Sequence, residues 1–398
     1  MLHGTTAHFE RGRSLFATLS RRVSPGVSLF ECTKECGRFL DENQTTHVQS
    51  GPPPSMWNYR LEAPRHVLAR ETLVSALTRF ADPWSHATLN YSGVAVRRVT
   101  FEQYCSKRIH DSCTWALIGS VLGERSGRVF DFALSGRGDG LDYLGGAVAE
   151  NLRKQVAAFD RAETIDAGEH EVVLSSPAAA VLLHEVIGHS AEAALERPSR
   201  IGDYLPCRIA TDHLTVLDDP LAPNGPANYE YDDENVRSFN PTVVVKDGIL
   251  VARLHSQVSA KAANTLSTGN GRAASALNDA LPRMSNLVCK AGVVSETEMI
   301  NRIRNGILIH RLADGVNNGR KIEARVILAE RIRNGKKSGT FVTGGRISEG
   351  IGVLLRTIDI GNNCSFNPNS LCGKAGQLLF DVGTFAPSIR LTRLRIVV

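Results

Sequence analysis

Val-Val-Leu-Ser-Ser-Pro-Ala-Ala-Ala-Val-Leu-Leu-His-Glu-Val-Ile-Gly-His-Ser-Ala-Glu-Ala-Ala-Leu-Glu, residues 172–196, is the most informative segment of this chain. Its first three residues are aliphatic and predict a short buried strand. Either of the two serines that follow can cap a helix, and Pro177 suits the first helical turn, where a missing N–H costs nothing. The alanine- and leucine-rich run after it predicts a helix that carries His184, Glu185 and His189.

Two imidazoles that bracket a carboxylate on one helix allow a hydrolase to hold a metal and keep a base beside the activated water. In the common zinc-protease pattern the histidines are four residues apart, so both project from one helix face. His184 and His189 are five apart, which separates them by about 140° on a regular helix. They can share an ion only if the helix loosens, through a π-bulge or a break near Gly188. Otherwise the segment is an amphipathic helix with two unrelated histidines.

The sequence His-Glu-Val-Ile-Gly-His-Ser-Ala-Glu resembles the HExxxH segment of the TldD/PmbA family of metallopeptidases. Further motifs follow in the family's order, ending in a cysteine motif, at residues 217–219, 232–234, 246–250, 268–272, 282–286 and 372–377. The resemblance covers the chain from about Val129 to the end. It implies an α+β fold like that of TldD/PmbA proteins, in which an N-terminal α/β region precedes a β-rich C-terminal metal-binding domain.

The remaining sequence pattern also favours α+β, because few helical segments stand beside many antiparallel strands. Helical spacing is found at residues 144–159 and 299–307. Residues 243–251 predict a hairpin around an Asp-Gly turn. Strands are expected at 93–101, at 324–330 and 339–343 joined through Asn334-Gly335, and at 388–398 with one phase slip at Arg393.

Length predicts about two domains, and the Ser-Gly-Pro-Pro-Pro-Ser run at residues 50–55 predicts a linker. Combined with the resemblance, this implies a divergent N-terminal segment and linker at 1–55, an N-terminal α/β domain at 56–165 and a metallopeptidase domain at 166–398. The net charge of +5 is mild and spread out, so nucleic-acid binding is not indicated, and no apolar run is long enough to span a bilayer. Eight scattered cysteines show no disulfide pattern, and no secretory signal is evident, so a cytoplasmic location is expected.

Two histidines leave a zinc-like ion short of a ligand, because a catalytic site usually has three protein ligands and an open position. Spacing alone cannot choose the third ligand among the Asp, Glu, His and Cys side chains elsewhere. The resemblance implies Cys372. It also implies one divalent ion, with zinc expected and iron as the alternative, since both accept imidazole and thiolate. Glu185 then stays unligated and acts as the general base.

The resemblance suggests further site residues. Glu192 is expected to hold one of the imidazoles by a hydrogen bond, and a surface helix glutamate is the alternative. Asn270, Arg272 and Arg283 are candidates for gripping a peptide backbone, although the first two also fit a plain turn. An acidic cluster is left out of the catalytic set, because capping and turn roles explain it as well: Asp218, Asp219, Asp232, Asp233 and Glu234.

In the TldD/PmbA family such chains hydrolyse amide bonds of flexible or unfolded peptides, in a heterodimer with a sister subunit that lacks the metal motif. This chain keeps the motif and is expected to be the catalytic partner, with an extended peptide added to a sheet edge. The N-terminal third does not match, and Ser190 replaces the glycine usual after the second histidine. Substrate and partner choice therefore stay open. The alternatives are a hydrolase of a small-molecule amide conjugate in a specialised pathway and a non-catalytic scaffold subunit.

Overall fold

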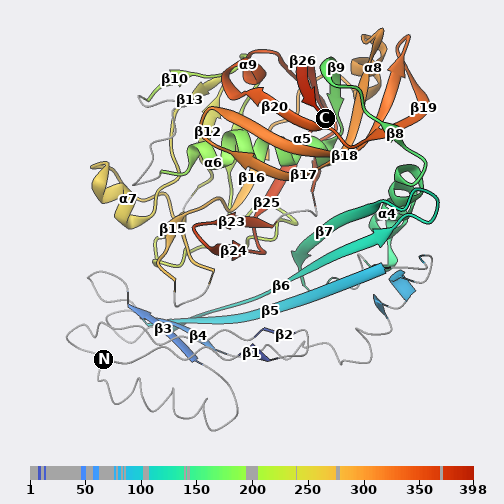
Figure 1. Ribbon diagram of the computed structural model, residues 1–398. Helices are drawn as coiled ribbons and strands as arrows, with labels where there is room; N and C mark the ends of the chain where they lie inside the picture. Colours follow the sequence, from blue (N-terminus) through green and yellow to red (C-terminus); the bar gives the residue numbers. More distant parts are fainter. Residues whose placement is uncertain are drawn as a thin grey trace.

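Figure 1 shows a computed structural model of the chain. It describes residues from Thr114 to the C-terminus except 139, 141–143, 194–204, 239, 275–277 and 368–370, together with 76, 77, 79–81, 84 and 87–89. Before Thr114 it otherwise describes only strand backbone. The expected N-terminal segment is therefore described only as β1 (His8–Phe9), β2 (Arg13–Ser14) and β3 (Thr46–Ser50), and Cys32 and Cys36 lie outside the described residues.

The C-terminal part contains a sheet that closes on itself. Its strands run in the order β17-β9-β26-β20-β18-β19-β8, β21 pairs with β26, and β17 also pairs with β18. The second pairing of β17 joins β17, β9, β26, β20 and β18 into a ring, and closure of this kind removes exposed strand edges. The bounds are β8 Glu163–Thr164, β9 Gly168–Leu174, β17 Asn305–Asn317, β18 Lys321–Arg333, β19 Lys336–Thr343, β20 Arg346–Gly350, β21 Ile358–Ile360 and β26 Ile389–Val397.

A buried helix, α5 (Ser176–Leu183), lies between this sheet and a second one with the order β10-β13-β12-β11-β16-β25-β22 (Figure 1). The helix packs against β17 of the first sheet and β25 of the second. Because it is apolar on all sides, it fits only inside the main core. The bounds are β10 Cys207–Arg208, β11 Val216–Asp218, β12 Thr242–Lys246, β13 Ile249–Leu250, β16 Asn286–Cys289, β22 Ser365–Phe366 and β25 Gly383–Ala386.

The N-terminal part is a sheet in which the long strands β5, β6 and β7 form an antiparallel meander. The helix α4 (Ala147–Phe159) contributes Leu152 and Val156 to a separate core that also holds Trp115 and Phe130. Leu328 of β18 belongs to this second core, so the two parts of the chain are packed together. The bounds are β4 Trp57–Leu61, β5 Ala87–Phe101, β6 Lys107–Leu122 and β7 Val129–Arg137.

Short elements complete the described structure, and several of them surround the site. They are η1 His184–Gly188, α6 His189–Ala191, α7 Gln257–Ala262, β14 Gly271–Arg272, β15 Leu281–Pro282, α8 Glu296–Asn301, α9 Ile351–Arg356, β23 Cys372–Lys374 and β24 Gln377–Leu379. Among the described residues, no helix combines the length and the apolar character needed to cross a membrane.

Most of the local predictions are confirmed. β9 ends at Leu174 and Ser175 is the N-cap of α5, with a proline in its first turn. Asp247 and Gly248 adopt φ values of 48° and 74°, the left-handed conformations that a tight hairpin turn between β12 and β13 requires. The phase slip expected at Arg393 is present as a register shift between Leu391 and Leu394.

The predicted helix at residues 299–307 is wrong in its C-terminal half. Helical spacing placed a helix over residues 299–307, but α8 ends at Asn301 and β17 begins at Asn305. Ile307 has a place in β17, where it pairs with Val172 of β9 in the main core. Long-range strand pairing therefore overrides the local period at this position.

Candidate metal centre

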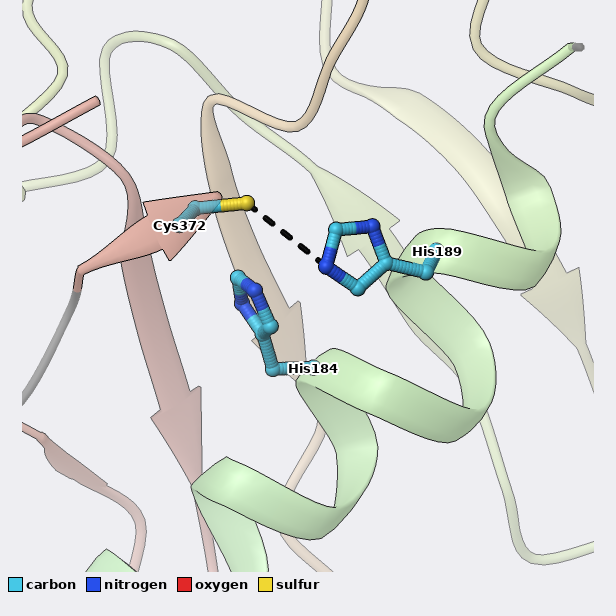
Figure 2. Close-up of side chains that lie close together, drawn as sticks. All are labelled: His184, His189 and Cys372. Atoms are coloured by element: carbon cyan, nitrogen blue, oxygen red, sulfur yellow. Dashed lines mark hydrogen bonds between the residues drawn. The ribbon is translucent and has the colours of Figure 1, made fainter. Parts of the chain in front are cut away.

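The helix that carries the two histidines changes its winding at the first of them. α5 ends at Leu183, and residues His184–Gly188 form a π-helical segment in which the His189 N–H donates to the His184 carbonyl oxygen. This confirms the loosening that the five-residue spacing required. The two imidazoles now lie on one side of the helix, with ring centroids 4.9 Å apart and planes at 89° (Figure 2).

Gly188 explains why this distorted turn can sit in a closely packed core. A Cβ atom at Gly188 would lie 2.0 Å from Sδ of Met284, so no larger residue fits without displacing that side chain. Met284 is itself fully buried. The glycine in the motif is therefore needed for close packing against Met284.

Cys372 approaches the histidines from another part of the chain. It begins β23, which turns back as β24 through Ala375 and Gly376, both in the left-handed conformation. Its Sγ lies 3.6 Å from Nε2 of His189, and the nearest ligand atoms of His184, His189 and Cys372 all lie within 4.8 Å of one another (Figure 2). The structure thus brings all three predicted ligands to one point.

Polar partners outside this cluster orient both imidazoles. Nδ1 of His189 lies 2.9 Å from Oε2 of Glu192, and Nδ1 of His184 lies 3.4 Å from Oγ1 of Thr384. Glu192 is 1% exposed and also accepts hydrogen bonds from Lys374 Nζ at 2.8 Å and from a backbone amide. Glu192 is therefore a buried anion held in place by several donors, and it leaves Nε2 of His189 turned toward the sulfur.

The charges of these groups stabilise one another. Burial disfavours charge on the Glu192 carboxylate, yet the neighbouring His189, Lys374 and Arg283 lower its pKa to about 2. Burial likewise disfavours the imidazolium form of His189. The attraction of the Glu192 carboxylate is larger than this effect and raises the pKa of His189 well above its usual value. Burial also disfavours the thiolate of Cys372, but the two imidazoles hold its pKa well below the usual value. A thiolate is the form that ligates a metal.

The three side chains fit a divalent ion of the zinc type. Zinc binds imidazole nitrogen at about 2.0–2.1 Å and thiolate sulfur at about 2.3 Å, so ligand atoms around a tetrahedral ion lie roughly 3.3–3.7 Å apart. The 3.6 Å between Cys372 Sγ and His189 Nε2 matches this spacing. Imidazole and thiolate are donors that zinc and iron both accept.

Glu185 follows His184 in the chain but is not part of the ligand cluster. Burial raises the pKa of its carboxyl group. Its side chain lies against Gly315, at which a Cβ atom would be 2.6 Å from Glu185 Cγ and 3.0 Å from Oε1. Its carbonyl oxygen accepts a hydrogen bond from Asn317 Nδ2 at 2.6 Å, and the same amide donates to Ser190 Oγ at 3.0 Å. The end of β17 therefore holds both the side chain and the backbone of Glu185.

The cluster opens onto a cavity of about 1310 Å³. One wall is formed by α5, the π-helical segment and β23, and another by β7 and the β17–β18 hairpin. Glu185, His184 and Cys372 all line this cavity. Its size is sufficient to enclose several residues of an extended peptide.

The predicted substrate-binding residues lie in the interior rather than in the cavity wall. Asn270 Nδ2 donates to Asp218 and to the Arg283 carbonyl, and Arg272 forms an ion pair of 2.6 Å with Asp381. Arg283 is fully buried and donates from Nη2 to the Cys372 carbonyl at 2.7 Å. Of the described cavity-lining residues, none is one of these three.

The acidic cluster has the capping and turn contacts that the sequence suggested. Asp218 accepts from the backbone and side chain of Ser285, and Asp232 accepts backbone N–H groups of Glu234, Val236 and Gly271. Asp219 and Asp233 also accept backbone amides, and Glu234 accepts the first amide of α7.

Sequence reasoning missed Gly315, Asn317, Thr384 and Arg311 as residues of this site. A turn signal, Asp-Gly followed by Asn-Asn-Gly, marks 314–319 as a hairpin end. The signal does not show that this hairpin contacts the helix that carries Glu185, because that contact depends on how β17 pairs with β9 and β18.

Two imidazoles and a thiolate around one point, beside an unligated carboxylate, define a metalloenzyme type of site. The chain belongs to the TldD/PmbA family, since residues 167–397 match the PmbA/TldA metallopeptidase C-terminal domain. The family and the α+β fold class expected from the sequence are therefore confirmed.

Relatives and solved structures agree with this assignment. A metalloprotease of Methanocaldococcus jannaschii is 31% identical over 221 residues, which are 54% of this chain and 48% of that protein. A zinc metalloprotease TldD homolog of Saccharolobus solfataricus is 25% identical over 286 residues, 70% of this chain and 60% of that protein. This chain thus spans about half to three fifths of the length of these relatives. TldE from Thermococcus kodakarensis shares the fold, with a TM-score of 0.66 at 16% identity over 88% of this chain and 80% of that chain.

Proposed function

We propose that this chain is the metal-binding, catalytic subunit of a metal-dependent peptidase. The observation that carries the proposal is the meeting of His184, His189 and Cys372 beside Glu185, whose carboxylate is outside the ligand cluster. The names of the relatives, a metalloprotease and a zinc metalloprotease, support this class of activity. This site is of the HExxxH type, with the cysteine as third ligand.

His184, His189 and Cys372 would hold one divalent ion, for which zinc is favoured by the donor set and by the name of the S. solfataricus relative. When bound, such an ion supplies Lewis acidity, which lowers the pKa of a water and stabilises negative charge on a carbonyl oxygen. Glu185 accepts the proton of the attacking water and returns it to the departing amine. The raised pKa of Glu185 suits this task, because it makes the carboxylate a better proton acceptor.

Glu192 and Lys374 position His189, one of the proposed metal ligands, and do not contact the substrate. The contact of Glu192 with Nδ1 of His189 fixes the ring orientation and leaves Nε2 for the ion. Lys374 holds Glu192 and also donates to the Pro282 carbonyl oxygen at 2.9 Å, which ties the β23–β24 hairpin to the ligand helix. The buried contacts of Asn270, Arg272 and Arg283 favour a similar supporting role over a direct grip on the peptide.

The substrate that fits this cavity is an extended peptide, because an open cavity between a helix and a hairpin admits a flexible chain and excludes a folded domain. A sister subunit of the same family that lacks the metal motif is the proposed partner. The similarity in fold to TldE from T. kodakarensis supports a partner with this fold.

The test is hydrolysis of an unstructured peptide, such as reduced and alkylated insulin B chain, with and without a sister subunit, followed by mass spectrometry. Glu185→Gln should lower the rate by about 10²–10⁴-fold and leave bound metal unchanged. The matched control is Glu169→Gln, at a half-exposed glutamate of β9 that pairs with Arg393. Wild-type turnover in Glu185→Gln would refute the role of Glu185. Failure of metal-loaded wild type to cleave any unfolded peptide would refute the peptidase proposal.

A further inference from the structure

Arg311 of β17 lines the cavity that contains Glu185 and Cys372, and its guanidinium contacts the carbonyl oxygen of Ala133, another residue of the cavity wall. In a regular strand Ile309 and Leu312, three residues apart, would point to opposite faces. The pairing of β17 with β18 shifts register on both sides of Arg311, and both Ile309 and Leu312 belong to the main core. The bulge therefore keeps two apolar side chains inside and directs Arg311 into the cavity.

Arg311 has weak partners. Nη1 donates to Gln155 Oε1 and Nη2 to the Ala133 carbonyl oxygen, each at 3.4 Å, and the guanidinium lies 5.7 Å from the centre of the Phe130 ring. Within the described part of the chain it forms no ion pair with a carboxylate. Burial lowers the pKa of Arg311 to about 10, so the cation is disfavoured at a position where no anion compensates for it.

Other basic side chains of the cavity differ from Arg311 in this respect. Arg320 is exposed near the hairpin end and is solvated. The remaining two are paired: Arg325 with Asp131 at 3.4 Å and with Asp314 at 2.8 Å, and Lys374 with Glu192 at 2.8 Å. Arg311 is therefore a partly enclosed cation that has its charge available for a ligand.

We propose that Arg311 binds a carboxylate of the substrate, either the C-terminal group of a peptide or an acidic side chain. A guanidinium matches a carboxylate with two parallel hydrogen bonds, and the low polarity around Arg311 strengthens such a pair. Arg311 precedes Gly315, the residue in contact with Glu185, by four residues, which is at most about 13 Å because the register of the strand shifts between them. A peptide lying along β17 with its carboxylate at Arg311 presents an amide bond a few residues away to Glu185. This assignment rests on the peptidase function proposed above.

The test measures binding without hydrolysis, so that it is independent of turnover. Metal-loaded Glu185→Gln protein is titrated by calorimetry with N-acetylated Ala-Gly-Ala-Gly-Ala carrying a free C-terminal carboxylate, and with its C-terminal amide. A third peptide is amidated and carries one internal glutamate. Tighter binding of the first peptide than of the amide, by tenfold or more, indicates a terminal carboxylate. Tighter binding of the third peptide than of the amide indicates an acidic side chain.

The Arg311→Met substitution, made in the Glu185→Gln protein, should abolish the preference, so that all three peptides bind equally. Their affinity should equal that of the Glu185→Gln protein with Arg311 intact for the amidated peptide without glutamate. Its melting temperature should equal or exceed that of the parent, because an unpaired buried cation is replaced by an apolar group of similar length. Arg311→Gln gives a second test that keeps a polar side chain. The matched control is Arg325→Met, which removes a paired arginine of the same cavity and should keep the preference.

Equal binding of all three peptides to the parent protein, or a preference that survives in both Arg311 variants, would overturn the assignment. If the carboxylate preference depends on Arg311 while wild-type protein cleaves no peptide, the binding site stands and the peptidase proposal fails. If wild type cleaves peptides without any carboxylate preference, the peptidase proposal stands and the role of Arg311 is refuted.

Discussion

Replacing Gly315 by alanine should disable the proposed base without unfolding the chain. The added Cβ would lie 2.6 Å from Glu185 Cγ and 2.9 Å from its Cδ, whereas carbon atoms in contact are normally about 3.5–4.0 Å apart. The backbone φ of Gly315 lies outside the left-handed region, so the backbone itself tolerates alanine. The close contact is then relieved by the side chain of Glu185, which must move by about 1 Å. A displacement of this size in a catalytic group lowers turnover by about 10²-fold. Overpacking of the contact costs about 1–3 kcal/mol of stability.

The assay compares kcat on an unstructured peptide with the melting temperature and the metal content of the same preparation. Gly352→Ala is the matched control, because this exposed glycine of α9 has open space around its Cβ position and alanine favours a helix. Gly315→Ala should lose about two orders of magnitude in kcat and keep its metal, while Gly352→Ala should keep wild-type kcat. A Gly315→Ala protein with wild-type kcat would show that the position of Glu185 does not limit the reaction.

Three further substitutions test the supports of the site and the buried charge. Glu192→Gln removes the anion that orients His189 and should weaken metal binding by about 10–100-fold in a chelator competition, with unchanged affinity as the contrary result. Asn317→Ala leaves the Glu185 carbonyl without its partner and should cost about 1–3 kcal/mol in denaturant unfolding; a loss near zero would contradict that role. Burial raises the pKa of Glu234 to about 7 from its usual 4.5, so the folded protein binds the extra proton between these values and loses stability as pH rises through them. Glu234→Gln should remove that loss and melt higher than wild type above pH 7, and parallel melting curves from pH 4.5 to 8 would refute this.

The helix at the centre of the site could be predicted from local sequence. Ser175 and a following proline mark its start, and the five-residue spacing of His184 and His189 requires a wider turn, which the π-helical segment supplies. These features depend on residues that are close in the chain. Periodicity and capping are therefore sufficient to predict them.

The third candidate ligand could not be predicted in this way. Cys372 is 183 residues from His189, and only its place in the family motif distinguished it from the other cysteines. Its position beside the imidazoles depends on the β23–β24 hairpin and on buried contacts such as that of Arg283 with its carbonyl. The sequence around Cys372 does not predict the β23–β24 pairing or the hydrogen bond from Arg283.

The residues of β17 that line the cavity could not be predicted from the sequence for a related reason. A bulge in β17 directs Arg311 into the cavity, and the register of the same strand brings Gly315 and Asn317 to Glu185. A shift of one residue in a strand reverses the face on which each side chain lies. The alternation of apolar residues in β17 does not show where the bulge is, so these residues become identifiable only from the paired strands.

The proposed metal centre requires that His184, His189 and Cys372 bind a single metal ion. Elemental analysis of purified protein by inductively coupled plasma mass spectrometry tests this binding. One equivalent of zinc or iron per chain is predicted for wild type and for Glu185→Gln, and a loss of that metal is predicted for His189→Ala and for Cys372→Ala, with the fold verified by circular dichroism. A folded Cys372→Ala protein that keeps a full equivalent, or a wild-type protein that binds no metal when it is supplied, would contradict the claim.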